Sequence, residues 1–308
     1  MTTPSTTRHQ WVSGARPRTL PAAVVPVAVG AAVASFTGFE IGAFSFGART
    51  FLALVVALAL QVGVNYANDY SDGIRGTDTQ RVGPIRLVGQ GLASPSDVKR
   101  AAFISFGVAT LAGVILVLLT AAWWLLIVGA LAVASAWFYT GGPRPYGYAG
   151  LGEIFVFVFF GLVAVVGTTF VLTDQIQLVA ILFAIPVGVL ACALLVINNL
   201  RDIPGDTLAG KKTLAVRLGD ANTRDFYGFC LFLPFAITAL VGLGGIGFVD
   251  QFPAASLIAL AALPAAFIPW QQVRGGAVGP ELIPVLAWTG RVQLLYGGLA
   301  TLGIALSG

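Results

Sequence analysis

Long apolar runs alternate with short polar segments along the whole chain. Each run approaches the roughly 20 residues that an α-helix needs to cross the hydrocarbon core of a bilayer. The pattern therefore predicts about nine membrane-spanning helices, at residues 19–38, 49–68, 99–120, 122–141, 152–173, 177–199, 224–244, 253–271 and 281–306. Because the runs recur to the C-terminus, we expect residues 1–308 to form a single polytopic, all-α membrane domain.

The composition agrees with this interpretation. Hydrophobic residues make up 57% of the chain, charged residues make up 10%, and the mean hydropathy is +0.89. These values are typical of a membrane protein and argue against a soluble core. The first apolar run is too long for a signal peptide and lacks a small-residue cleavage site, so we expect no cleavage. Cys192 and Cys230 lie in separate apolar runs and are predicted to be packing residues.

The basic residues are distributed asymmetrically. With these spans, every lysine and arginine except Arg49 falls on one side of the membrane. The positive-inside rule makes that side cytoplasmic. The tail at residues 1–18 and the motif-bearing loops at 69–98 and 200–223 are therefore expected in the cytoplasm. The net charge of +4 then reflects membrane orientation, and no nucleic-acid partner is expected.

Two acidic motifs repeat along the chain. Asn68-x₃-Asp72 closes the second predicted helix, and Asn198-x₃-Asp202 closes the sixth, with Asp206 four residues later. Both motifs fall at predicted cytoplasmic helix ends. Neighbouring carboxylates repel each other by a few kcal/mol at an effective dielectric constant of about 20. A Mg²⁺ ion removes this repulsion and can bind phosphate oxygens at the same time.

The motifs therefore predict a Mg²⁺ site that binds a pyrophosphate group. The candidate metal ligands are Asn68, Asp69, Asp72, Asp78, Asn199, Asp202 and Asp206. Basic residues on the same side could neutralise the remaining phosphate charge; they are Arg75, Arg81, Arg86, Arg144, Lys211 and Lys212. The alternative is that all these residues are solvated charges at helix ends. A single aspartate would favour that alternative, whereas two matched motifs flanked by basic residues favour ligand binding.

A pyrophosphate site at the face of a membrane protein suits a lipid-linked diphosphate. If that diphosphate is allylic, its departure leaves a carbocation, which a water-excluding chamber protects. Aromatic faces stabilise cations, and aromatic residues gather in two of the predicted helices: Trp137, Phe138, Tyr139, Phe155, Phe157, Phe159, Phe160 and Phe170. Aromatic residues also serve as interfacial anchors, which is the alternative role for this group.

The chain resembles the UbiA superfamily of intramembrane aromatic prenyltransferases. The resemblance rests on an Asn-Asp-x-x-Asp motif at residues 68–72 and an Asp-x-x-x-Asp motif at 202–206. Within the superfamily, the chain is most similar to the 1,4-dihydroxy-2-naphthoate polyprenyltransferase branch, through segments 15–21, 68–78, 83–91, 139–143 and 198–219. The general pattern often has a third acidic residue where this chain has Gly76. Asp78 follows two residues later, as it does in the naphthoate branch.

The resemblance implies a helix bundle around a central cavity, a Mg²⁺ cofactor, a polyprenyl diphosphate donor and 1,4-dihydroxy-2-naphthoate as the acceptor. Transfer with loss of carbon dioxide and pyrophosphate would give a demethylmenaquinol, in the plasma membrane and at a cytoplasm-facing site. Catalytic roles are implied for Asp72, Asp202, Asp206 and Arg144. The candidates for contact with the acceptor are Arg18, Asn65, Tyr139 and again Arg144.

Three other functions compete with this interpretation. The acceptor could be 4-hydroxybenzoate, haem or a phospho-sugar, because the acidic motifs specify only the superfamily. A secondary transporter would also contain repeats and charged residues, but its charges would lie at mid-depth rather than at one face. A non-catalytic scaffold would not account for the repeated carboxylate motifs.

Overall fold

The structure is a computed structural model that describes residues 6–38, 41–76, 85–243 and 252–308. These residues form α-helices, short 3₁₀ segments and one π-helical segment, and no strand occurs among them. The elements are α1 (Arg8–Gly14), η1 (Pro17–Thr19), α2 (Pro21–Phe36), α3 (Ala43–Ile74), α4 (Pro95–Thr120), α5 (Leu125–Phe138), η2 (Tyr146–Ala149), α6 (Gly152–Val156), η3 (Phe157–Val163), α7 (Ala164–Thr173), α8 (Leu178–Leu208), α9 (Leu214–Gly242), η4 (Ala254–Ala262), α10 (Leu263–Arg274), η5 (Gly279–Glu281) and α11 (Leu282–Ala305).

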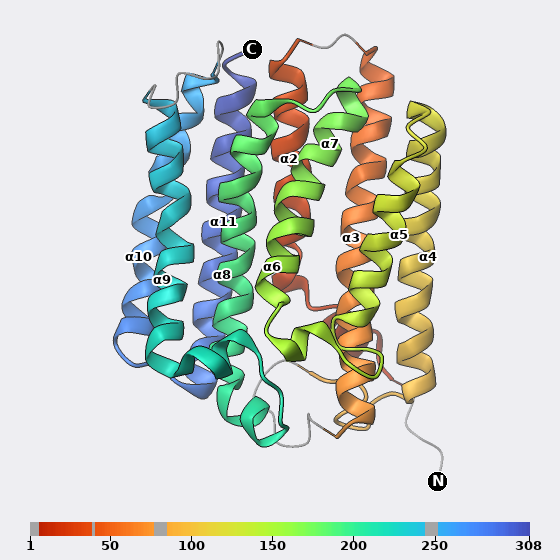
Figure 1. Ribbon diagram of the computed structural model, residues 1–308, viewed down its shortest axis with the longest axis vertical. Helices are drawn as coiled ribbons and strands as arrows, with labels where there is room; N and C mark the ends of the chain where they lie inside the picture. The colour runs from red at the N-terminus through yellow and green to blue at the C-terminus, as the bar shows by residue number, and fades with distance from the viewer. Residues whose placement is uncertain (1–5, 39–40, 77–84, 244–251) are drawn as a thin grey trace.

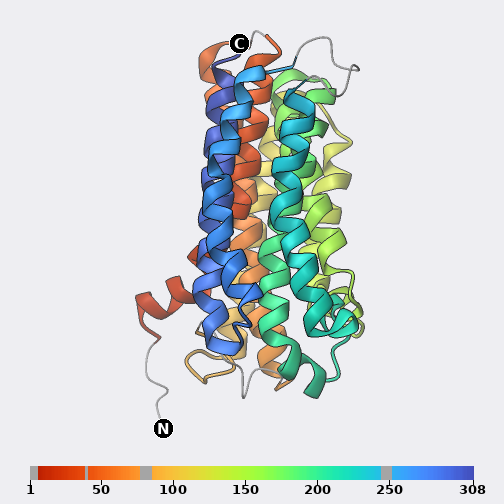
Figure 2. The same cartoon turned by 90° about the vertical axis from the view of Figure 1, so that its left-hand side faces the viewer.

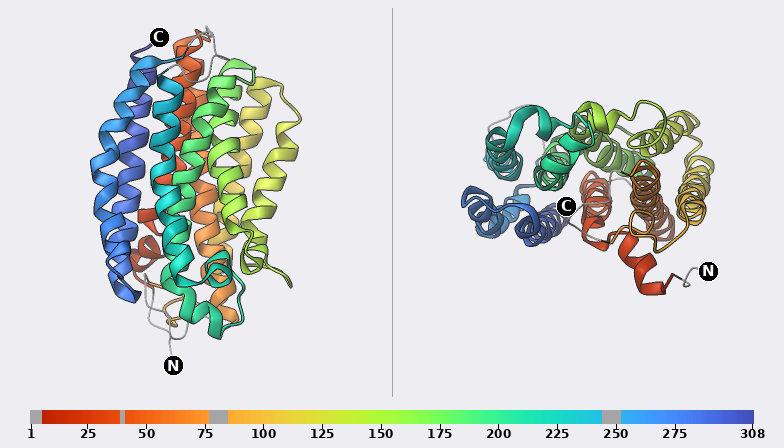
Figure 3. Two further views of the ribbon diagram at one scale, coloured as in Figure 1. Left: turned by 60° about the vertical axis from the view of Figure 1, so that its left-hand side comes forward. Right: turned by 90° about the horizontal axis from the view of Figure 1, so that it is seen from below.

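The long helices lie side by side with their axes roughly along the long axis of the molecule (Figure 1). Seen from below in Figure 3, they follow one another around the bundle in chain order. The last helix, α11, packs against α2 and so joins the two ends of the series. The short α1 lies outside the bundle (Figure 2), and the chain bends by 52° between the Arg8–Thr19 segment and α2.

Each predicted span coincides with a helical segment within the described residues. Among the residues that the structure describes, 6 helices are long and apolar enough to cross a membrane, or up to 7 if the bent pair formed by Arg8–Thr19 and α2 is one span. The apolar α5 has only 14 residues, and α11 carries the polar residues Arg291 and Gln293. The all-α, multi-pass fold is thus confirmed, whereas the number of crossings and the orientation stay predictions.

The helices that carry the acidic motifs are longer than predicted. α3 continues past residue 68 to Ile74, and α8 continues past residue 199 to Leu208. α9 begins at Leu214 and bends at Gly219, where φ is 76°. The segments 69–98 and 200–223, predicted as loops, are therefore partly helical. Hydropathy marks only the apolar part of a helix, and the polar turns continue because their side chains find partners in the fold.

The start of α4 agrees with the sequence. Serine is a favoured N-cap residue and proline is favoured in the first helical turn. Here the Ser94 hydroxyl accepts a hydrogen bond from the Asp97 N–H at 3.1 Å, and Pro95 begins the helix. This cap fixes where the segment after residue 85 rejoins the bundle.

α8 is the most buried of the candidate spans, with 78% of its apolar window inside the protein. The continuous rod of α6, η3 and α7 packs closely against it. A Cβ atom on Gly161 would lie 2.7 Å from the Cα of Gly188, so the two backbones meet here without side chains between them. η3 is π-helical, and π-helical turns inside α-helices are frequent at functional sites.

Candidate active site

A cavity of about 1100 Å³ lies between α2, α3, α4, α5, the rod formed by α6, η3 and α7, and α8. Its polar end is lined by members of both acidic motifs: Asn68, Asp72, Asn198, Asn199, Asp202 and Asp206. Its other walls are largely apolar and include Leu60, Val114, Val128, Val163, Gly167 and Val171. One chamber therefore joins a charged mouth to an arm that could hold a hydrocarbon chain.

Asp72 lies in the polar end and is only 3% exposed. Lys211 Nζ donates to Asp72 Oδ1 at 3.0 Å, and an Arg86 guanidinium nitrogen lies 3.7 Å from Asp72 Oδ2. The Tyr148 hydroxyl donates to the same carboxylate. Burial, and after it the negative charge of Asp72, raises the pKa of Tyr148, so the phenol stays protonated and keeps donating this bond. A buried carboxylate needs such partners because an unpaired buried charge is costly.

Lys211 links the two motifs. Its ammonium also lies 3.6 Å from Asp206 Oδ1, so a single side chain contacts one carboxylate on α3 and one on α8. Asp202, one turn earlier on α8, pairs with the neighbouring Arg201 through two contacts of 2.9 and 3.0 Å. Motifs that are far apart in the sequence therefore line the same mouth.

Other predicted residues lie outside the cavity wall. Asp69 is 1% exposed and accepts hydrogen bonds from the Leu87 N–H at 2.7 Å and the Val88 N–H at 3.0 Å. Its carboxylate therefore anchors the segment after residue 85 to α3. Arg75 donates to the backbone carbonyls of Thr140 and Gly142 and so holds the loop that follows α5.

The remaining predicted residues divide into three groups. The first group lines the cavity and consists of Asn65, Arg86, Tyr139, Lys211 and the exposed Arg18. Arg144 and Lys212 are exposed and are not among the cavity-lining residues of the described chain. Asp78 and Arg81 lie outside the described residues.

The donor set fits a Mg²⁺ ion that shares its coordination with a diphosphate. In the described ranges, no group of three or more His, Cys, Asp or Glu side chains could hold a metal ion. Mg²⁺ usually takes one or two carboxylates and completes its octahedron with water and phosphate oxygens, and Asp72 and Asp206 can supply such carboxylates. Asn199 donates its Nδ2 to Glu153 at 3.0 Å. Because the Glu153 carboxylate can only accept a hydrogen bond, it contacts the amide nitrogen of Asn199. The amide oxygen of Asn199 is therefore available as a metal ligand.

Comparison with known proteins agrees with this geometry. Residues 23–277 match the UbiA prenyltransferase family. The chain belongs to this family. It is 50% identical over 287 residues to the 1,4-dihydroxy-2-naphthoate octaprenyltransferase of Mycobacterium tuberculosis, covering 93% of this chain and 94% of that protein. The Escherichia coli protein of the same name is 40% identical over 239 residues, 76% of each chain.

A solved structure of a UbiA homologue from Archaeoglobus fulgidus, bound to DMAPP and Mg²⁺, has the same fold. Its TM-score is 0.65 at 17% sequence identity, over 96% of this chain and 99% of that one. The UbiA fold predicted from the motifs is therefore confirmed.

Several polar residues of this UbiA site were not expected from the sequence. Tyr148 holds Asp72, and Thr140 donates to Asn68 Oδ1 at 2.8 Å. Both come from the loop after α5, whose polar residues stand out in such an apolar chain and could have drawn attention to it. Glu153, which the helix dipole would favour at a helix start without any function, is instead 6% exposed and holds Asn199.

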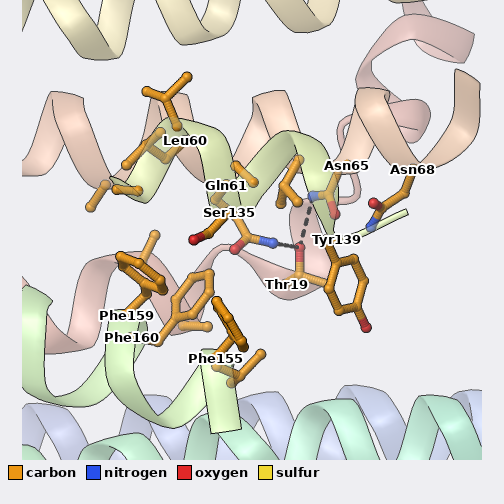
Figure 4. Close-up of a pocket in the computed structure, with 18 of the residues that line it drawn as sticks. Thr19, Leu60, Gln61, Asn65, Asn68, Ser135, Tyr139, Phe155, Phe159 and Phe160 are labelled. Carbon is orange, nitrogen blue, oxygen red and sulfur yellow. Dashed lines mark hydrogen bonds between the residues drawn. The ribbon is translucent and has the colours of Figure 1, made fainter. Parts of the chain in front are cut away.

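Aromatic rings line the cavity beside its polar end. Three of them, Phe155, Phe159 and Phe160, lie together in Figure 4. The Phe155 ring stacks on Tyr146, with 4.0 Å between centroids. Phe157 and Phe170, which the sequence placed in the same group, pack against apolar clusters instead.

Proposed function

We propose that this UbiA-family protein transfers a polyprenyl chain from a polyprenyl diphosphate to 1,4-dihydroxy-2-naphthoate, with loss of carbon dioxide and pyrophosphate, to give a demethylmenaquinol. Relatives at 37% and 50% identity are named for this acceptor. The observation that carries the proposal is Lys211, whose ammonium contacts Asp72 and Asp206 from the two motifs at the mouth of a largely apolar chamber.

In this proposal the polar end of the cavity binds the diphosphate. Asp72, Asp202 and Asp206, with Asn68 and Asn199, would hold Mg²⁺, which neutralises phosphate charge and makes pyrophosphate a better leaving group. Two basic side chains that pair with Asp72 in the structure, Lys211 and Arg86, would turn to the phosphate oxygens, which they bind by charge-assisted hydrogen bonds.

The apolar arm of the cavity would hold the prenyl chain and keep water from the reacting carbon. A bond forms between that carbon and the acceptor ring while the carbon–oxygen bond to the diphosphate breaks and pyrophosphate leaves. The ring's bond to its carboxylate then breaks, carbon dioxide is released, and the electron pair of that bond stays on the ring. The faces of Phe155 and Phe159, near the polar end, would stabilise the positive charge that develops on the allylic carbon.

We further propose that the protein lies in the plasma membrane with the mouth of the cavity facing the cytoplasm. The distribution of basic residues supports this orientation, because Arg86, Arg201 and Lys211 surround the mouth whereas Arg49 lies at the opposite end of α3.

The test uses purified protein in nanodiscs with Mg²⁺, a polyprenyl diphosphate and a panel of acceptors. We expect prenylated product and carbon dioxide from 1,4-dihydroxy-2-naphthoate, and no product from 4-hydroxybenzoate, haem or a phospho-sugar. Product from one of those acceptors but none from 1,4-dihydroxy-2-naphthoate would overturn the acceptor assignment. No product with any acceptor would overturn the enzyme assignment.

A further inference from the structure

Gln61 is a buried polar side chain in the wall of the cavity. It lies on α3, is 6% exposed and donates its Nε2 to the Thr19 hydroxyl at 2.9 Å. Its Oε1 is buried and has no hydrogen-bond partner among the described residues. A buried acceptor without a hydrogen-bond partner destabilises the protein, so its presence in a cavity wall points to a ligand that donates a hydrogen bond to it.

The orientation of the Gln61 amide is fixed by its neighbours (Figure 4). The Thr19 hydroxyl has one proton, and it donates that proton to the Arg16 carbonyl at 2.9 Å. It can therefore only accept from Gln61 and from Asn65 Nδ2, which lies 3.1 Å away. Both amides must present their nitrogen to Thr19. The free atom of Gln61 is thus an oxygen, and its ligand must donate a hydrogen bond.

Arg16 directly precedes η1, the 3₁₀ turn that ends at Thr19, and it lines the same cavity as Gln61. Its φ of 54° lies in the left-handed region, which is strained for a residue with a side chain. One of its terminal nitrogens, Nη2, is buried and lacks a hydrogen-bond partner in the described part of the chain. This nitrogen can only donate, so its ligand must accept, and an anion satisfies it best.

We propose that Gln61 and Arg16 form the acceptor subsite: Gln61 Oε1 accepts a hydrogen bond from a ring hydroxyl of an aromatic hydroxy acid, and Arg16 pairs with its carboxylate. This inference rests on the proposed function and adds the residues that recognise the acceptor. Phe155, Phe159 and Phe160 lie near Gln61 in Figure 4 and offer apolar faces for the ring.

The chemistry of 1,4-dihydroxy-2-naphthoate selects which hydroxyl Gln61 binds. The 1-hydroxyl is next to the carboxylate and donates to it within the molecule. The 4-hydroxyl is free to donate, so it is the group that Gln61 Oε1 accepts from. The analogue 1-hydroxy-2-naphthoate keeps the carboxylate and the ring but lacks this donor.

The test measures equilibrium binding of both naphthoates to the full-length protein in nanodiscs by calorimetry. Wild-type protein should bind the 4-hydroxylated ligand about tenfold more tightly than the analogue, which is the value of one buried hydrogen bond. Gln61→Leu should bind both ligands with the same affinity, near that of the analogue. Arg16→Gln should weaken both ligands by a similar factor and keep the tenfold ratio.

The chain offers a matched control. Gln293 on α11 is fully buried, and neither polar atom of its side chain has a partner in the described residues, but it is not among the cavity-lining residues. Gln293→Leu should leave both affinities unchanged. If Gln61→Leu keeps the tenfold ratio, or if wild-type protein shows none, the subsite is wrong. The proposed function is tested separately, because it fails only if wild-type protein does not prenylate 1,4-dihydroxy-2-naphthoate.

Discussion

Replacing Lys211 with methionine would test how the two acidic motifs are held together. The ammonium lies 3.0 Å from Asp72 and 3.6 Å from Asp206. Each contact is worth about 5 kcal/mol by Coulomb's law at an effective dielectric constant of about 20. Much of this offsets the lost hydration of the buried charges, and removing one partner of a buried ion pair typically costs about 3–5 kcal/mol net.

We therefore expect Lys211→Met to lower the midpoint of thermal unfolding by at least about 6 °C in the absence of Mg²⁺. Added Mg²⁺ should raise the midpoint of the variant more than that of the wild type, because a divalent cation can occupy the position between the two carboxylates. The assay is thermal unfolding in nanodiscs, with and without millimolar Mg²⁺.

Lys99→Met provides the matched control, because Lys99 is exposed at the start of α4 and contacts only the Tyr70 ring among the interactions described for it. This variant should shift the midpoint by no more than about 1 °C in either buffer. The reasoning is refuted if Lys211→Met is as stable as the wild type and gains no extra stability from Mg²⁺.

Three further predictions follow from the site and from the helix packing around it. Asp72→Asn and Asp202→Asn should each reduce turnover by at least about 100-fold while the protein still inserts and elutes as a folded species; near wild-type turnover would contradict the metal-ligand role. Because burial and the Asp72 charge raise the pKa of Tyr148 above 10.0, the folded protein should lose stability as the pH rises past about 10, where the unfolded chain's tyrosine releases its proton. Tyr148→Phe should lose less over the same range, and an identical pH profile would contradict this. Gly161→Ala should destabilise the bundle by about 1–3 kcal/mol, because its Cβ would lie 2.7 Å from the Gly188 Cα; an unchanged midpoint of unfolding would contradict that packing.

The sequence predicted the helices well because each one is a long apolar run. Where the helices end is decided by other interactions. α3 continues through its acidic motif because Asp69 finds two backbone N–H groups in the segment after residue 85. No periodic pattern could have revealed this partner, since it depends on how that segment folds back against α3.

The contacts within the candidate site were equally hard to predict from sequence patterns. Spacing and residue type indicated Asp72, Asp202 and Asp206, which line one cavity mouth. Spacing could not indicate that Tyr148 would hold Asp72, or that the Gln61 amide would be fixed by Thr19. These contacts join positions that are far apart in the sequence, and a single chain gives no sign of such pairs.

The central claim is that Asp72 on α3 and Asp202 on α8 bind the same Mg²⁺–diphosphate. The most direct measurement is a double-mutant cycle on the affinity of an unreactive prenyl thiodiphosphate in saturating Mg²⁺, with Asp72→Asn, Asp202→Asn and the double variant. If one complex bridges both residues, the double variant should lose little more affinity than the weaker-binding single variant. Strictly additive losses, or a single variant that binds like the wild type, would contradict the account.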